Sequence, residues 1–284
     1  MPLPIVIAVL GAALLHAAWN ALAHAAQDKL VAFALIDLGY LACSAVIVTL
    51  APVPDRAAWP FIAGSAALQI LYQLLLLQSY RLGDFGQVYP LARGTSPWVV
   101  AVLSVCALGE SLPTAELTGV LVLSAGLAIL AFADGRPGRA QLPALSAAVA
   151  TGVMIASYTV VDATGVRRAG TVVGYVGWMF LAQALPLPLF ALIRRRRSLL
   201  TDLRPTWPRG MTGGVLSLAA YGLVVWAQSR APENLPAIAA LRETSIILGV
   251  LMSTFLFHER LGRARTAAST VVLVGIAVLE LTPR

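Results

Sequence analysis

Two charged residues stand next to each other inside an apolar stretch of the chain. Arg242 and Glu243 lie in the segment 236–261, which is otherwise apolar enough to cross a lipid bilayer. An arginine near the middle of a membrane costs about 2.5 kcal/mol or more, so Arg242 should face a watery cavity or a partner. Arg93 holds a similar position in an earlier apolar stretch. The two guanidinium groups could bind the anionic part of a solute. Alternatively, each ties helices together, or Arg93 extends to the membrane surface.

Glu243 needs a partner of its own. Neighbouring residues on an α-helix point about 100° apart, so a simple local pair with Arg242 is not expected. One interpretation is that Glu243 binds and releases protons, since burial makes a carboxyl group easier to protonate. The other is that it forms a fixed bond to Arg93 or to the backbone. Asp37, which lies within another apolar stretch, poses the same question, whereas Asp162 is expected at a membrane surface.

A polar and aromatic face is predicted on the first apolar segment. His16, Trp19 and Asn20 are spaced i, i+3 and i+4, which places them on one side of a helix. They either contact a substrate or hold helices together through hydrogen bonds of Asn and His. The first and second halves of the chain are similar in sequence, as described below. When they are aligned, Trp19 falls opposite Tyr158, which predicts aromatic walls on two sides of a central cavity.

Further polar residues occur within or at the ends of the apolar stretches. Tyr72, Gln73 and Tyr221 lie in the middle of their stretches and are expected to line the same cavity. Glu110 and Glu259 each end a stretch just before a polar turn. We therefore expect these two carboxyl groups to have a structural role, as helix caps or as partners in the turn.

The chain repeats itself after 149 residues. This shift places Arg93 on Arg242, Glu110 on Glu259 and Gly126 on Gly275. A repeat of this kind has to be found first, because it decides the architecture. It predicts two similar units, residues 1–135 and residues 136–284.

The composition is that of a membrane protein. Hydrophobic residues make up 59% of the chain and charged residues 12%, whereas soluble domains carry roughly 45–50% and about 25%. Helices are expected, because backbone groups in hydrocarbon must be satisfied within each segment. The sequence thus predicts an all-α integral membrane fold with ten transmembrane helices: 3–23, 30–51, 58–80, 86–108, 114–133, 142–163, 170–193, 210–230, 235–257 and 264–281.

Five spans per unit is an odd number, so the second unit must enter the membrane from the opposite side. The result is a pair of inverted repeats. In such folds the binding site lies near the middle of the membrane between the repeats, and rocking of one bundle against the other gives alternating access.

Short motifs in both halves resemble the EamA family of the drug/metabolite transporter superfamily. They are PLAR at 90–93 followed by GE at 109–110, LRET at 241–244 followed by HERL at 258–261, and HAAWN at 16–20. The resemblance covers nearly the whole chain. It implies two tandem five-helix repeats and the transport of small solutes, including amino acids, sugars, nucleotide-like metabolites and drugs.

The sequence and the resemblance together predict a secondary transporter for a small polar metabolite, amino-acid-like or otherwise anionic or zwitterionic, with export as the direction. Broad efflux of organic compounds is the alternative. From a different class, an intramembrane enzyme or a lipid-handling protein would need a catalytic cluster at one face or a lateral groove. No enzyme motif is found: His258 and Glu259 lack the second histidine of HExxH. We expect no metal, no cofactor and no nucleic-acid partner.

The setting of the protein is predicted from its basic residues. The chain has 19 arginines and one lysine, which is typical of a GC-rich genome and favours a bacterial inner membrane. The basic residues gather in the turns after the odd-numbered spans, which favours both termini outside. Described EamA members commonly have both termini in the cytoplasm, so the orientation stays open. The protein is expected to be a monomer or a homodimer, with protons as one candidate coupling ion.

Overall fold

The computed structural model describes residues 1–24, 26, 28–83, 85–109, 113–132, 138–196, 206–248 and 263–281. Throughout these residues the regular structure is helical. Glu110 and Glu259, which the sequence assigns structural roles, lie outside the described residues. The α-helices are α1 (Leu3–His24), α2 (Lys29–Leu50), α3 (Trp59–Leu82), α4 (Phe85–Leu108), α5 (Thr114–Ala131), α6 (Leu142–Arg167), α7 (Val172–Gln183), α8 (Pro186–Arg195), α10 (Trp207–Arg230), α11 (Leu235–Arg242) and α13 (Arg263–Leu281).

Local sequence signals set where several helices begin. Asp28 precedes α2, and its side chain accepts hydrogen bonds from the backbone N–H groups of Leu30 and Val31 at 3.0 and 3.2 Å. Thr171 caps α7 in the same way through the N–H of Gly174 at 3.1 Å. Such caps satisfy donors that the first helical turn leaves without partners. Short 3₁₀ turns lead into α3, α6 and α11, namely η1 (Arg56–Ala58), η2 (Arg139–Gln141) and η3 (Pro232–Asn234).

Seven helical segments of the described chain are long and apolar enough to cross a membrane. They correspond to seven of the ten predicted spans: α1, α2, η1 with α3, α4, η2 with α6, α7 with α8, and α10. The predicted span 170–193 is divided into α7 and α8, because Pro186 cannot continue the hydrogen bonding of α7. The apolar part of α5, Leu117–Ala131, is shorter than the seven. The protein is therefore an all-helical, multi-pass membrane protein.

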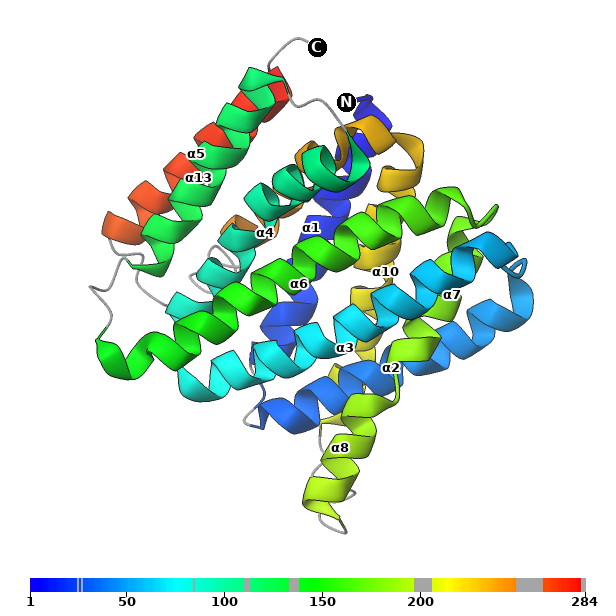
Figure 1. Ribbon diagram of the computed structural model, residues 1–284. Helices are drawn as coiled ribbons and strands as arrows, with labels where there is room; N and C mark the ends of the chain where they lie inside the picture. The colour runs from blue at the N-terminus through cyan, green and yellow to red at the C-terminus, as the bar shows by residue number, and fades with distance from the viewer. Residues whose placement is uncertain are drawn as a thin grey trace.

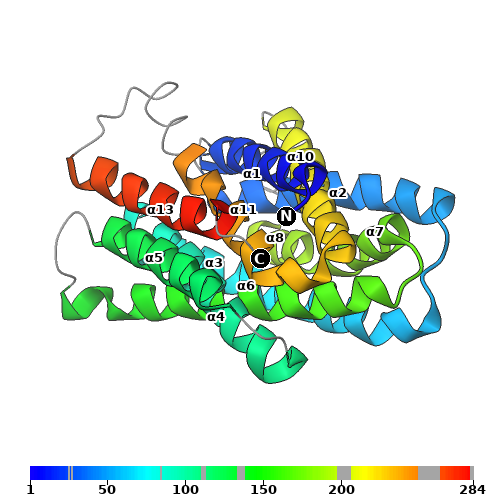
Figure 2. The same cartoon turned by 90° about the horizontal axis from the view of Figure 1, so that it is seen from above.

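The helices form one bundle in which segments far apart in the sequence pack together (Figure 1). α3 lies along α6, and α1 lies along α10. α2 packs against α10, and α3 also packs against α7. At one side of the bundle α5 and α13 form an antiparallel pair, visible from the side in Figure 1 and from above in Figure 2.

The pair formed by α5 and α13 is held by two glycines that face each other's helices. A Cβ atom on Gly126 would meet the backbone nitrogen of Val272 at 2.9 Å, and one on Gly275 would meet that of Leu123 at 2.6 Å. Only a residue without a side chain permits this approach. The shift of 149 residues relates Gly126 to Gly275 and Leu123 to Val272, so the contact is reciprocal.

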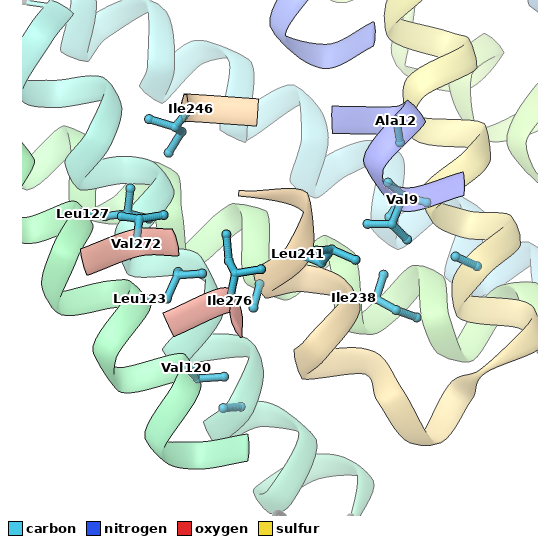
Figure 3. Packing of buried hydrophobic residues seen from close by; sticks show 14 of the residues in the cluster. Val9, Ala12, Val120, Leu123, Leu127, Ile238, Leu241, Ile246, Val272 and Ile276 are labelled. Carbon is cyan, nitrogen blue, oxygen red and sulfur yellow. The ribbon is translucent and has the colours of Figure 1, made fainter. Parts of the chain in front are cut away.

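One hydrophobic cluster joins the first half of the chain to the second (Figure 3). It takes buried side chains from α1 and α5 and packs them against α11, α13 and the residues that follow α11. This packing places α11 in the interior, where its residues from Leu235 to Arg242 are all buried. The labelled members are Val9, Ala12, Val120, Leu123, Leu127, Ile238, Leu241, Ile246, Val272 and Ile276.

Candidate functional site

Three charged side chains from the two halves of the chain meet in the interior. Nε of Arg93, on α4, lies 2.8 Å from Oε2 of Glu243. Nε of Arg242, at the end of α11, lies 3.7 Å from Oε1 of the same carboxylate. The exposed fractions are 3% for each arginine and 0% for Glu243. The cluster therefore holds two positive charges and one negative charge away from water.

The pairing of Arg242 with Glu243 corrects a prediction. A regular helix would point these neighbours in different directions, but α11 ends at Arg242 and the chain turns at Glu243, with φ −70° and ψ −10°. The N–H of Glu243 bonds to the carbonyl of Ala240 at 3.0 Å, three residues back instead of four. Because the helix is interrupted here, both side chains reach one site. Interrupted helices are a common way to build binding sites in membranes.

The local structure of α4 positions Arg93. Pro97 lies four residues further along the helix and has no N–H to donate to the carbonyl of Arg93. On the neighbouring helix α6, a Cβ atom at Gly152 would lie 2.5 Å from Cβ of Thr95 and would also clash with the carbonyl of Ala92. Gly152 thus lets α4 and α6 approach closely at the level of Arg93.

The ion pairs leave hydrogen-bonding capacity unused. At 3.7 Å the contact of Arg242 is too long for a hydrogen bond, and neither oxygen of Glu243 accepts a hydrogen bond of good geometry. Nε and Nη2 of Arg242 also lack a hydrogen-bond partner. Nη2 of Arg93 donates to the hydroxyl of Ser245 at 3.3 Å. Buried polar atoms without partners are costly, so this cluster is suited to bind a further polar group.

Three tyrosines from three helices form a connected aromatic row. The ring of Tyr158, on α6, lies 5.7 Å from the ring of Tyr72, on α3, and 5.7 Å from the ring of Tyr221, on α10, both in edge-to-face geometry. Tyr72 and Tyr158 interact electrostatically with both Arg93 and Arg242. The structure thus brings together these three predicted residues beside the charged cluster.

The predicted polar face of α1 is held by bonds within the helix. Nε1 of Trp19 donates to Nδ1 of His16 at 3.2 Å, and the two rings meet edge to face at 5.1 Å. The side-chain amide of Asn20 donates to the carbonyl of His16 at 2.8 Å. His16 is half-buried and interacts electrostatically with Arg93 and Arg242, which places it near the charged cluster.

Gln73 belongs to a separate polar group between α2 and α3. Its Nε2 donates to Oδ1 of Asp37 at 3.2 Å and to the hydroxyl of Tyr40 at 3.0 Å. Oδ2 of Asp37 has no hydrogen-bond partner. Both Asp37 and Gln73 are buried, so they form an interior polar contact between the two helices.

Asp162, predicted at a membrane surface, is buried between helices instead of exposed. Its exposed fraction is 0%. The hydroxyl of Tyr175 donates to Oδ1 at 2.7 Å, and that of Tyr221 donates to Oδ2 at 2.6 Å. Sequence reasoning missed Asp162 and Tyr175 because both lie near helix ends. The spacing of Asp162 one turn after Tyr158 was the signal that could have found it.

An apolar groove of 490 Å³ lies between α1, the segment after α11 and α13. Thr244 forms part of its wall, whereas its neighbours Glu243 and Ser245 belong to the charged cluster. The short segment after Arg242 therefore separates the groove from the charges. The lining residues are Ile7, Leu10, Gly11, Leu14, Thr244, Ile247, Leu248 and Leu273.

Comparison with known proteins identifies the family. Residues 142–281 match the model of the EamA-like transporter family, and the charged cluster includes Arg242 and Glu243 from this region. Through these residues, the chain belongs to the EamA-like transporter family. This EamA protein is therefore a multi-pass membrane transporter and, at the level of its family, not an enzyme.

The fold of the EamA protein is shared with a solved crystal structure. The two chains agree with a TM-score of 0.78 over 98% of this chain and 97% of the other, at 17% sequence identity. At this identity the similarity shows the fold alone, but it extends across the first half, which lies outside the family match. No curated protein has a significantly similar sequence.

Proposed function

We propose that this EamA protein is a secondary transporter for a small anionic or zwitterionic metabolite, such as an amino acid. The substrate site consists of Arg93, Arg242 and Glu243, with Tyr72, Tyr158 and Tyr221 beside them. The observation that carries the proposal is the charge count of the cluster, two arginines against one carboxylate, all buried. Because an uncompensated buried charge is costly, the cluster favours an additional anionic group.

The proposed site includes further side chains predicted from the sequence. His16 lies close enough to both arginines to interact with them electrostatically, so we include it in the site. Trp19 and Asn20 hold His16 in place through their hydrogen bonds. Gln73 follows Tyr72 on α3 but is bonded to Asp37, so its contribution is to fix α3 against α2.

We further propose that residues 1–135 and 136–284 are inverted repeats. The reciprocal contact of Gly126 and Gly275 supports this. A helix that lies on a two-fold axis between the repeats packs against its equivalent in the other repeat, as α5 does against α13. The packing of α3 on α6 and of α1 on α10 supports it as well, since these pairs exchange under the same operation. The site then lies at the interface of the repeats.

The burial of all three charges bears on the mechanism. A solute reaches them only if the helices around the site move, and alternating access supplies such a movement. Export, residence in a bacterial inner membrane, and a monomeric or homodimeric state belong to the same proposal, and the family resemblance and the arginine-rich composition suggest them.

Counterflow in proteoliposomes tests the function. The parent should exchange amino acids or organic acids from a labelled panel that also contains sugars and organic cations. Arg242→Ala and Glu243→Gln should each lower this exchange by about tenfold or more, since one lost contact of about 1.4 kcal/mol has that effect. Arg230→Ala, at the exposed end of α10, is the matched control and should exchange like the parent. Normal exchange by both site variants would show that the site is elsewhere.

The apolar groove supports a second candidate, the transport of amphiphilic organic compounds or lipids that enter sideways from the bilayer. Its lining is apolar and it lies one residue from the charged cluster. A Cβ atom on Gly11 would meet no atom within 4 Å, so Gly11→Leu would fill the groove without a backbone clash. Loss of exchange for amphiphilic compounds alone in this variant would favour the second candidate.

A further inference from the structure

Three carboxyl groups are fully buried in the described part of the chain, and each has a different environment. They belong to Asp37, Asp162 and Glu243, all with an exposed fraction of 0%. A buried carboxyl group takes the charge state that its neighbours stabilise. The three environments therefore determine which group can change its charge state during transport.

Two of the three environments each suit one charge state. Glu243 lies between Arg93 and Arg242, and two positive charges keep its carboxylate ionised. Asp37 accepts a hydrogen bond from the amide of Gln73 and interacts with the neutral hydroxyl of Tyr40, and its Oδ2 lacks a partner in the interior. No cation contacts Asp37 among the described residues, so the neutral acid is the form that this site accommodates.

Asp162 has an environment that accommodates both charge states. Its hydrogen-bond partners are the hydroxyls of Tyr175 and Tyr221, which donate to its two carboxyl oxygens. These two donors stabilise a carboxylate. Hydroxyl groups also accept hydrogen bonds. After one of these hydroxyls rotates, it can therefore accept a hydrogen bond from the protonated, neutral Asp162.

Among the described residues, Asp162 takes part in no ion pair. α7 and α10 contribute Tyr175 and Tyr221, and α3 contributes the neutral Ser65 and Gln69. On α6 itself, Tyr158 lies one turn away. The charged groups of α4 and α11, Arg93 and Arg242, are paired with Glu243. The basic residues of η1 and η2 are exposed.

The position of Asp162 connects it to the charged cluster. Tyr221 donates to Asp162, and its ring lies 5.7 Å from that of Tyr158. Tyr158 in turn interacts electrostatically with Arg93 and Arg242. A proton bound at Asp162 turns one carboxyl oxygen from an acceptor into a donor, so Tyr221 or Tyr175 must reorient. That change reaches the aromatic row beside the substrate site.

We propose that Asp162 is the proton-binding site of this transporter, and that Glu243 stays ionised throughout the cycle. The proton comes from water on one side of the membrane and returns to water on the other, with no other group consumed. As a coupling site, Asp162 depends on the proposed transport function. As a proton-binding group, it can be tested without any substrate.

The first experiment uses protons alone as the ligand. The reconstituted protein is titrated and followed by infrared difference spectroscopy, in which a protonated carboxyl group gives its own C=O band. The pH-dependent part of this band should disappear in Asp162→Asn and remain in Glu243→Gln and Asp37→Asn. Its persistence in Asp162→Asn, or its loss in Glu243→Gln, would overturn the proposal.

Tyr175→Phe gives a second test, which applies even if Asp162→Asn does not fold. This change removes one hydrogen-bond donor from Asp162 and should shift the pH midpoint of the band. An unchanged midpoint would contradict the proposal.

The second experiment addresses coupling. Proteoliposomes are loaded with a solute that the parent exchanges, and proton movement is followed with a trapped pH dye. Asp162→Asn should keep solute exchange but lose both proton movement and accumulation driven by a pH gradient, and Asp162→Glu should restore them. Proton-driven accumulation by Asp162→Asn would refute the coupling role. A parent that exchanges no solute would instead refute the proposed transport function and leave the infrared result standing.

Discussion

At the scale of single residues, one carboxylate organises the interior. Glu243 receives Arg93 from the first half of the chain and Arg242 from the second. These arginines occupy equivalent positions of the repeat, whereas the residue equivalent to Glu243 is Gly94. The site is therefore asymmetric: two equivalent positive charges share a carboxylate that only one half supplies. Because of this asymmetry the cluster carries a net positive charge. We propose that the anionic group of the substrate binds to this charge.

Removing one partner of the buried pair should destabilise the protein more than removing both. Arg93→Gln leaves Glu243 with only the longer contact to Arg242, and loss of one partner of a buried ion pair costs about 3–5 kcal/mol. The double variant Arg93→Gln/Glu243→Gln should recover part of this loss. Thermal unfolding in detergent measures the three variants against the parent, and additive effects of the single changes would contradict a direct interaction.

At the scale of helices, the site depends on close contact and on interrupted hydrogen bonding. Pro97 leaves the carbonyl of Arg93 without its usual helical donor, and α11 ends at Arg242. Both irregularities occur beside an arginine. Gly152 brings α6 against α4 at the same level. The two interruptions therefore lie beside the charges, where the proposed alternating access requires the helices to move.

Gly152→Ala should be destabilising, because the new methyl group would overlap Thr95 and the carbonyl of Ala92. Overpacking of this kind costs about 1–3 kcal/mol, and displacement of α4 should also lower solute exchange. Gly64→Ala is the matched control, since a Cβ atom at Gly64 meets nothing within 4 Å. Unfolding temperature and counterflow should both distinguish the two variants, and equal behaviour would refute the proposed close contact.

At the scale of the whole molecule, the pairing of the helices supports the proposed inverted repeats. The pairs of α3 with α6 and α1 with α10 correspond to one another, and α5 pairs with its own equivalent α13 (Figure 1). A structure related by an axis in the membrane plane has this property. The same axis predicts which loops lie on opposite sides of the membrane.

Labelling of single cysteines should show that equivalent loops face opposite sides. In a background with Cys43 and Cys106 replaced by serine, Val53→Cys reports on the loop after α2, and Arg196→Cys reports on the chain after α8. Both positions are exposed. If the repeats are inverted, a membrane-impermeant thiol reagent added outside intact cells should label one of the two and spare the other. Labelling of both from the same side would refute the inverted arrangement.

The reciprocal glycine contact predicts similar effects of two distant substitutions. Gly126→Val and Gly275→Val each place a side chain against the backbone of the opposite helix, so both should separate α5 from α13. We expect losses of stability of similar size, about 1–3 kcal/mol each. Thermal unfolding gives the comparison; a large loss in one variant and none in the other would show that the contact is not reciprocal.

The sequence alone predicted the class of the protein and many of the residues at its interior site. The length of the apolar runs indicated membrane helices, because hydrocarbon leaves the backbone no other way to satisfy its polar groups. The cost of an arginine in lipid singled out Arg93 and Arg242 before any contact was known. The shift of 149 residues indicated a doubled architecture, since two equivalent segments adopt equivalent structures.

Only the tertiary structure decided how these residues meet. The prediction that Glu243 points away from Arg242 assumed a regular helix. In the structure α11 ends at Arg242, so both side chains reach the same site. Asp162 was expected at a surface because it lies near the end of a stretch, yet Tyr175 and Tyr221 from other helices cover it. Periodicity describes one helix at a time. Which side chains share an interior is fixed by the packing between helices, and no pattern within a single segment contains that information.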